Sequence, residues 1–519
     1  MAFHDPQKIK SLKILGGLLL FFIVLEIGFS GLLYFFPHAR KIPSVMRLNT
    51  WMCLFLLSVC IVQFLMNDSL FHVITIFFKW FEKSSKAFKV HFLAAIAILC
   101  IAMYLSTGTL SPYANTVNFP PDYPLVDPAC HYLFNGDYYQ FSAVFCLLDG
   151  KPRSTWTRSP VLHRILYNGI AYPLMKIFKH DFGGLIFNFL LTILAFVSFA
   201  LFALRTNGEG GAIAGMWLLA LYPGITYYSG QPFLYAFIVP GCLWLYMLLW
   251  KLNKYTSMSN VLITSLGMGF LFLGYDLLIF FGTAAFLLLA FRKKYVQLPV
   301  MVLGMLAFPA LWWCVAHYGL RASFASENSR AYSVILQSYF RPVDFPQWLE
   351  LLKRLPENLM YNYFFSSFLF LPLLFTVSLI VAARVRQKLL TLPESCLFAS
   401  VALVFFFNNC APPYDFRWQM RGTWIARLYQ PLFVVFLFSC TRLFQAFSVR
   451  KLSRPLTVTM TFLLAVTVFG NGMVALGPAL NDPWGISSGI YWNFYKHSPP
   501  QTMKMNLLKY GRRPWGFCR

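Results

Sequence analysis

Long apolar segments separated by short polar connections run through nearly the whole chain. A membrane-spanning helix needs about 20 mostly apolar residues, and about thirteen segments approach that length. They lie near 14–36, 50–67, 90–105, 182–204, 211–228, 232–250, 259–275, 277–291, 297–319, 361–383, 394–410, 424–441 and 456–477. The apolar run 261–291 is divided at Gly274-Tyr275-Asp276, because an acid in mid-bilayer is costly. The pattern predicts an all-α polytopic membrane protein with about 11 to 15 spanning helices.

The longest polar interruption among these segments is 106–181. Within it, apolar side chains follow the spacing of an amphipathic helix at Tyr138, Phe141, Phe145 and Leu148. Such a helix is expected to lie on the membrane surface with Asp137 at its N-terminal end. There the carboxylate can be a helix cap, or it can act as a general base or metal ligand at the level of the lipid headgroups. Both interpretations fit the spacing.

Basic residues lie mostly in alternate connections, which is the distribution that cytoplasmic loops show. This rule predicts that 106–181, 320–360, 411–423 and the C-terminal tail face the extracytoplasmic side. The basic connection from His38 to Arg47 does not obey it. We expect three regions: 1–89 with two extra N-terminal spanning helices and a basic cytoplasmic loop, 90–477 as the transmembrane core with its external loop 106–181, and 478–519 as an external tail.

Composition narrows the class of protein further. Hydrophobic residues make up 58% of the 519 residues and charged residues 12%, about half the charged share of a soluble protein. The net charge of +25 is explained by basic loop ends and anionic lipid, so we expect no nucleic-acid partner. The eleven cysteines contain no C-x-x-C pair, which argues against a zinc or iron–sulfur site. Cys130 and Cys146 could form a disulfide if their loop faces an oxidising compartment.

Three sequence elements resemble the GT-C superfamily of polyprenyl-phosphate-sugar-dependent glycosyltransferases, which includes protein O-mannosyltransferases and lipid A aminoarabinose transferases. The first runs from Asp137-Tyr-Tyr through Ala143, Leu147, Gly150, Arg158-Ser-Pro160, Tyr172-Pro-Leu174 and Phe182-Gly183 to Asn188. The second is Leu221-Tyr-Pro-Gly-Ile-Thr-Tyr-Tyr-Ser-Gly230. The third is Arg427-Leu-Tyr-Gln-Pro-Leu432. The resemblance spans about 90 to 440 and implies a GT-C-like fold with a catalytic first external loop.

The resemblance gives Asp137 the role of the catalytic acid site. The family often has two adjacent acids here, whereas Gly136 precedes Asp137, so a second acid could come from Asp122 or Asp127. A departing lipid phosphate needs positive charge, and arginine pairs well with phosphate oxygens. The candidates are Arg158, Arg417, Arg421 and Arg427, although any one of them taken alone is more simply explained by binding to ordinary lipid headgroups. Candidates for stacking on a sugar ring are Tyr138, Tyr139 and Trp156.

The expected activity is transfer of a sugar from a polyprenyl-phosphate donor to a glycan, lipid or protein acceptor outside the cytoplasm. A polysaccharide polymerase or ligase, a non-catalytic GT-C-like subunit and a transporter of lipid-linked saccharides remain alternatives. We assign no cofactor, although His131, His163, His180 and the loop aspartates could hold a divalent cation. The predicted external loops contain almost no N-glycosylation acceptors, which favours a bacterial inner membrane over the endoplasmic reticulum.

Overall fold

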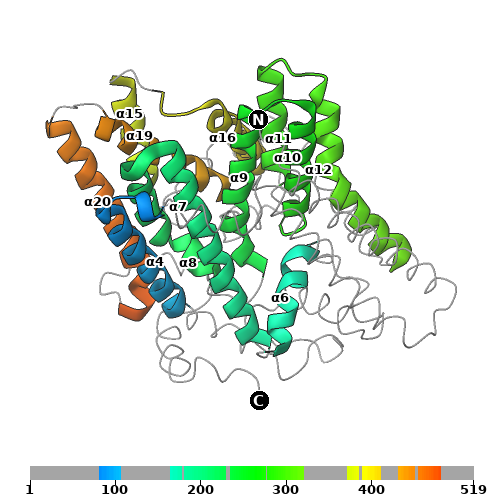
Figure 1. Ribbon diagram of the computed structural model, residues 1–519, viewed down its shortest axis with the longest axis horizontal. Coiled ribbons are helices and arrows are strands. Elements are labelled where there is room, and N and C mark those ends of the chain that lie inside the picture. The colour runs from blue at the N-terminus through cyan, green and yellow to red at the C-terminus, as the bar shows by residue number, and fades with distance from the viewer. Residues whose placement is uncertain are drawn as a thin grey trace, which may run out of the picture.

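The computed structural model describes residues 81–106, 164–177, 180–229, 234–275, 278–320, 371–384, 388–410, 430–449 and 454–480. All regular secondary structure in these ranges is helical, as predicted (Figure 1). The expected helices 14–36 and 50–67 and the amphipathic helix after Asp137 lie outside the described residues.

The described helices agree with most of the apolar segments. Their bounds are α4 Lys86–Ser106, α6 Ile165–Ile177, α7 His180–Ala220, α8 Pro223–Ser229, the 3₁₀ turn η4 Leu234–Phe237, α9 Ile238–Lys254, α10 Met258–Phe272, α11 Leu278–Phe291, α12 Gln297–Cys314, the π-helical turn η5 Val315–Gly319, α15 Leu371–Arg384, α16 Leu392–Cys410, α19 Gln430–Val449 and α20 Arg454–Leu480. The predicted break at Gly274 is confirmed, since α10 ends before it and α11 begins after it.

Five of the described helices are long and apolar enough to cross a membrane. They cover 86–104, 183–220, 235–254, 297–319 and 455–473, and four shorter apolar helices accompany them. This identifies a membrane protein, whereas the count of about thirteen spans is not confirmed. Two boundaries also differ from the prediction. The segment 211–228 ends at Ala220 and is followed by the separate helix α8, and α19, which is described from Gln430 on, continues beyond the predicted end at 441 to Val449.

Helix α7 folds back on itself at Gly208. This glycine has φ 67° and ψ −179° between two helical stretches, a conformation that is open almost only to glycine. A Cβ placed on Gly215 would meet the Phe199 ring at 2.7 Å, although these residues would lie about 24 Å apart along a straight helix. The two halves therefore pack side by side, as the separate predictions for 182–204 and 211–228 require.

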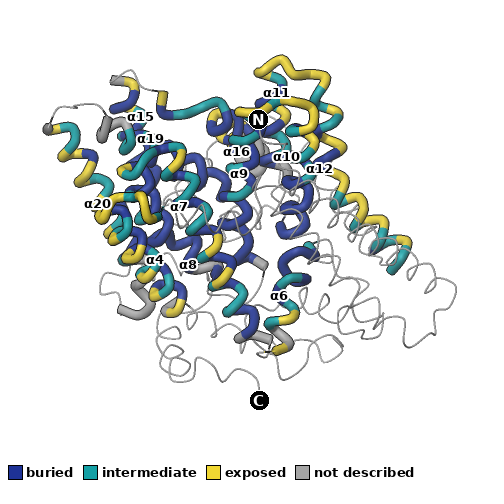
Figure 2. The backbone as a smooth tube through the Cα atoms, in the orientation of Figure 1, coloured by how far each residue is buried: buried dark blue, intermediate teal, exposed yellow. Residues whose placement is uncertain are grey.

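Burial separates a central set of helices from a peripheral set (Figure 2). Helices α9 and α19 are buried along most of their length, with Tyr246 and Phe438 stacked at 4.1 Å between them. Helices α4, α12 and α20 lie at the sides and expose large apolar residues such as Leu93, Leu303 and Phe462. Exposed apolar flanks of this kind are what lipid-facing helices require.

The connections α9–α10, α11–α12 and α15–α16 lie towards the top of Figure 1 and carry Lys254, Arg292, Lys293, Lys294 and Lys388, so we call this end of the bundle the basic end. Polar contacts join several helix ends there. Glu209 beside the α7 turn accepts a hydrogen bond from the Ser85 amide at 2.8 Å, and the Arg292 guanidinium donates to Asn253 at 2.6 Å. The side of the membrane that this end faces stays a prediction.

Candidate functional site

The predicted site residues lie outside the described residues. This holds for Asp137, for Asp122 and Asp127, for Arg158, Arg417, Arg421 and Arg427, for Tyr138, Tyr139 and Trp156, and for the cysteine pair Cys130 and Cys146. Their roles stay predictions. The described helices that flank these segments carry a set of polar side chains and polar contacts at the end of the bundle opposite the basic end. We call it the distal cluster: Arg164, Tyr167, Asn168, Asn188, Thr192, Tyr222, Ser229, Tyr275 and Gln430.

A buried hydrogen-bond chain connects α6, α7 and α8 within the distal cluster. The Tyr167 hydroxyl donates to the Asn188 side-chain oxygen at 2.5 Å. The Asn188 amide donates in turn to the backbone carbonyl of Ser229 at 3.1 Å. Burial raises the pKa of Tyr167 well above its usual value, and the bond to Asn188 opposes this only in part. The phenol is therefore a neutral donor, and Asn188 links the end of the first family-like element to the second.

A second buried contact connects α8 to α19. The Tyr222 hydroxyl donates to the Gln430 side-chain oxygen at 2.7 Å, and the Tyr222 ring stacks on Phe433 with centroids 3.7 Å apart and planes 8° apart. Gly224 allows this geometry, because a Cβ at that position would meet the Tyr222 ring at 2.6 Å. The second family-like element is thereby attached to the third at the residue where α19 begins.

Arg164 lies at the start of α6 and was not among the predicted site residues. Its guanidinium carbon is 4.7 Å from the centroid of the Tyr275 ring. The backbone amide of Leu166 donates to the carbonyl of Leu273 at 3.1 Å, which fixes α6 beside the end of α10. Arg164 therefore lies away from the basic end. The sequence offers one indication of this residue: Arg164 lies six positions after Arg158, which was a candidate for binding phosphate.

Two polar side chains of the distal cluster are buried without a hydrogen-bond partner. Both polar atoms of the Asn168 amide are unpaired, as is the hydroxyl of Thr192 one turn beyond Asn188. Leaving a buried polar group unsatisfied costs about 1–3 kcal/mol. Such groups call for an explanation, such as contact with water or with a bound molecule, and among the described residues they also occur at Thr264, Ser378, Ser439 and Asn471. The distal cluster therefore has hydrogen-bonding capacity that its own residues do not use.

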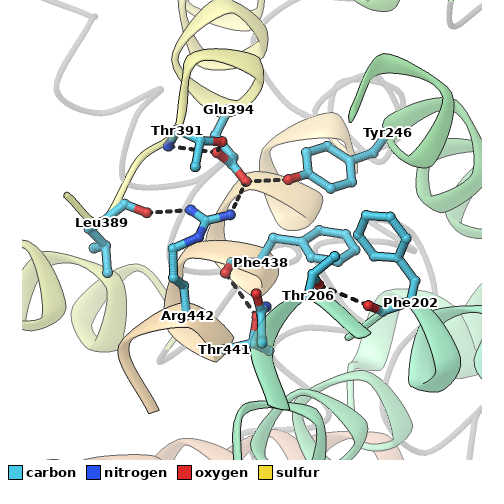
Figure 3. Close-up of polar contacts among 10 residues, drawn as sticks. Phe202, Thr206, Tyr246, Leu389, Thr391, Glu394, Phe438, Thr441 and Arg442 are labelled. Carbon is cyan, nitrogen blue, oxygen red and sulfur yellow. Dashed lines mark hydrogen bonds and ion pairs between the residues drawn. The ribbon is translucent and has the colours of Figure 1, made fainter. Parts of the chain in front are cut away.

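A contrasting cluster surrounds Glu394 at the basic end (Figure 3). One carboxylate oxygen accepts a bond from Arg442 at 2.6 Å and another from the Tyr246 hydroxyl. The other oxygen accepts bonds from the Thr391 amide at 2.7 Å and from the Thr391 hydroxyl. Arg442 also donates to the Leu389 carbonyl at 2.6 Å. We call these five residues the Glu394 cluster, and it joins α9, α16 and α19.

The sequence contains one local signal for the Glu394 cluster. Thr391-Leu-Pro-Glu394 before an apolar run is a capping box. In this motif the glutamate side chain accepts a hydrogen bond from the backbone amide of the capping residue. The ion pair with Arg442 has no such signal, because 48 residues separate the partners. Arg442 was expected in a polar connection, but α19 continues to Val449, so this arginine lies inside a helix and is mostly buried.

No metal centre appears in the part of the chain that the structure describes, where no three His, Cys, Asp or Glu side chains come together. The histidines and aspartates considered for a divalent cation lie outside it or have no described side chain. Comparison of the sequence with protein-family models and with curated proteins finds no matching family and no matching protein.

Proposed function

We propose that this chain is an integral-membrane glycosyltransferase that moves a sugar from a polyprenyl-phosphate donor to an acceptor on the extracytoplasmic side. The supporting observation is the arrangement of the distal cluster. Asn188, Ser229, Tyr222 and Gln430 come from three sequence elements chosen for their resemblance to one enzyme superfamily. Hydrogen bonds connect these elements in pairs at one end of the bundle. Contact among the three elements is what a common site would require.

The distal cluster lies next in sequence to the segments that carry the proposed chemistry. Arg164 lies in the later part of the predicted loop 106–181 that contains Asp137 and Arg158, and Gln430 follows Arg417, Arg421 and Arg427. In the proposed reaction the Asp137 carboxylate takes the proton of an acceptor hydroxyl. The hydroxyl oxygen forms a bond to the anomeric carbon as the bond from that carbon to the phosphate oxygen breaks. The lipid phosphate leaves with the electron pair, and arginines stabilise its charge.

The donor itself explains why such a site belongs at one end of an apolar bundle. A polyprenyl-phosphate sugar keeps its hydrocarbon tail in the bilayer while its phosphate and sugar stay at the surface. Transfer therefore needs polar groups directly beside lipid-facing helices. The buried, unpaired Asn168 and Thr192 offer donors and acceptors at this end of the bundle, and Arg164 adds a cation that can join the four predicted arginines in binding phosphate.

The first test uses the purified chain and Asp137→Asn, each given a panel of radiolabelled polyprenyl-phosphate sugars with membrane extract as the source of acceptor. Asp149→Asn, which changes another acid of the same loop, is the matched control. We expect the wild type and the control to consume one donor, and Asp137→Asn to lose at least about a hundredfold in rate, as removal of a general base does.

Two outcomes would reject this assignment. If the wild type consumes no donor, a transferase using these donors is excluded. If all three proteins consume a donor equally, Asp137 is a helix cap, and a polymerase that depends on loop arginines becomes the better explanation. Loss of activity on replacing Arg158 or Arg427 would then be expected instead.

A further inference from the structure

The turn after α11 has a lysine where helices usually place a glycine. The Lys293 amide donates to the Ala290 carbonyl and the Lys294 amide to the Leu289 carbonyl, both at 2.9 Å. This pair of bonds defines a Schellman motif, whose C′ residue adopts the left-handed conformation and is usually glycine. Lys293 occupies that position with φ 56°, and among the described residues it is the one non-glycine residue with positive φ.

The strain at Lys293 is not offset by packing of its side chain. A residue with a Cβ is less stable than glycine in the left-handed region, and Lys293 is exposed to solvent. Strained backbone positions occur preferentially where a side chain has a functional role. The observation therefore points to a use for the ammonium group outside the protein.

Other cations are held beside Lys293 by contacts between two helix turns. The bond from Arg292 to Asn253 joins the end of α11 to the end of α9. Gln297 donates to the Thr256 carbonyl, which joins the start of α12 to the same place. The exposed residues Lys254, Arg292, Lys293 and Lys294 thus form what we call the basic ledge. Within 234–275 and 278–320 there is no acidic residue to balance them.

The ledge borders an exposed apolar edge. Phe291, Tyr295 and Val296 are each more than half exposed, and α12 continues from them with exposed apolar residues along its length (Figure 2). The Lys254 ammonium lies 5.4 Å from the ring centroids of both Trp250 and Tyr255, as in side chains at a membrane–water boundary. A molecule that fits both surfaces has an anionic head next to a hydrocarbon tail.

We propose that the basic ledge binds the phosphate-bearing headgroup of an anionic phospholipid. Lysines close to a membrane surface attract anionic lipid, and each adds roughly fivefold to the affinity. The start of α4 provides a contrast at the same end of the bundle. Lys83 and Lys86 are also exposed there, but Glu82 and Glu209 lie in the same region. The two acids weaken the positive electrostatic potential of these lysines. This proposal does not depend on the proposed enzymatic activity.

The test titrates the full-length chain in neutral detergent with phosphatidylglycerol or phosphatidylcholine and counts bound lipids by native mass spectrometry. Lys293→Gly removes the charge and relieves the strain at once. It should therefore bind phosphatidylglycerol about fivefold more weakly while its unfolding temperature stays equal or rises. The triple variant Lys254→Ala, Lys293→Gly, Lys294→Ala should weaken binding about a hundredfold, and binding of phosphatidylcholine should not change.

A second triple variant, Lys83→Ala, Lys86→Ala, Lys388→Ala, removes as many exposed charges from the same end and is the matched control. It should keep its affinity for phosphatidylglycerol within about twofold. The proposal is overturned if both triples weaken binding equally, because the attraction would then be a property of total charge. It is also overturned if Lys293→Gly leaves phosphatidylglycerol binding unchanged.

Discussion

The Glu394 cluster and the distal cluster are both buried and polar, but they differ in how fully their hydrogen bonds are satisfied. Glu394 accepts four bonds on its two oxygens, and its cation, hydroxyl and amide donors come from α9, α19 and its own helix cap. In the distal cluster, Tyr167, Asn188 and Tyr222 are paired, while Asn168 and Thr192 are not.

This difference separates a structural role from a binding role. A polar network whose members all have partners rigidifies the helices that it joins and leaves nothing to bind another molecule. A buried unsatisfied group reduces stability and calls for an explanation, of which contact with water or with a bound molecule is one. The Glu394 cluster thus has the properties of a helix lock, whereas the role proposed for the buried distal cluster is binding. Substitutions in the two clusters should therefore affect different measured quantities.

The largest effect is expected from Arg442→Met. Removing the cation leaves the Glu394 carboxylate buried without its ionic partner, which should lower the free energy of unfolding by about 3–5 kcal/mol. The buried thiols Cys242, Cys396 and Cys440 lie on the three helices that the cluster joins, so a thiol-reactive dye reports their exposure during thermal unfolding in detergent.

A double variant distinguishes a lost charge balance from lost packing in this prediction. Glu394→Gln retains a side chain that can complete the capping box and removes the negative charge. Arg442→Met with Glu394→Gln should therefore recover more than half of the stability that Arg442→Met loses. If the double variant unfolds as easily as the single one, the arginine stabilises α19 by packing and the ion pair is not the lock.

The sequence predicts local features of both clusters and misses the long-range ones. Apolar length and periodicity predict the helices, and the acid at Asp276 correctly suggests the break after α10. The reversal of α7 follows from placing Arg205 between two apolar segments, but its position at Gly208 requires the positive φ that only the structure gives. The pairing of Glu394 with Arg442 and of Tyr222 with Gln430 depends on tertiary packing, for which a single sequence has no periodic signal. The proposed catalytic residues themselves lie outside the described ranges.

An intermediate effect is expected from Asn188→Leu in the distal cluster. This change removes the acceptor of the Tyr167 hydroxyl and the donor to the Ser229 carbonyl. Two buried polar groups lose their partner, and unfolding should become easier by about 1–3 kcal/mol. Thermal unfolding with the same dye measures it. Asn188→Asp is a useful companion, because its side chain has nearly the same shape as that of asparagine. It keeps an acceptor for the Tyr167 hydroxyl but loses the donor to the Ser229 carbonyl, so it should also be destabilised.

The smallest effect on stability is expected from Asn168→Leu, the same substitution in the preceding helix. Asn168 has no partner to lose, so removing its amide abolishes a desolvation cost and should leave the unfolding temperature equal or higher. On the proposed function, consumption of the polyprenyl-phosphate donor should nevertheless fall, because the amide would then be missing from the buried polar cluster that is proposed to bind the donor. A variant that is as stable and as active as the wild type would show that Asn168 contacts neither the protein nor the substrate. A variant as unstable as Asn188→Leu would show that its amide is paired, and the contrast between the two clusters would then be lost.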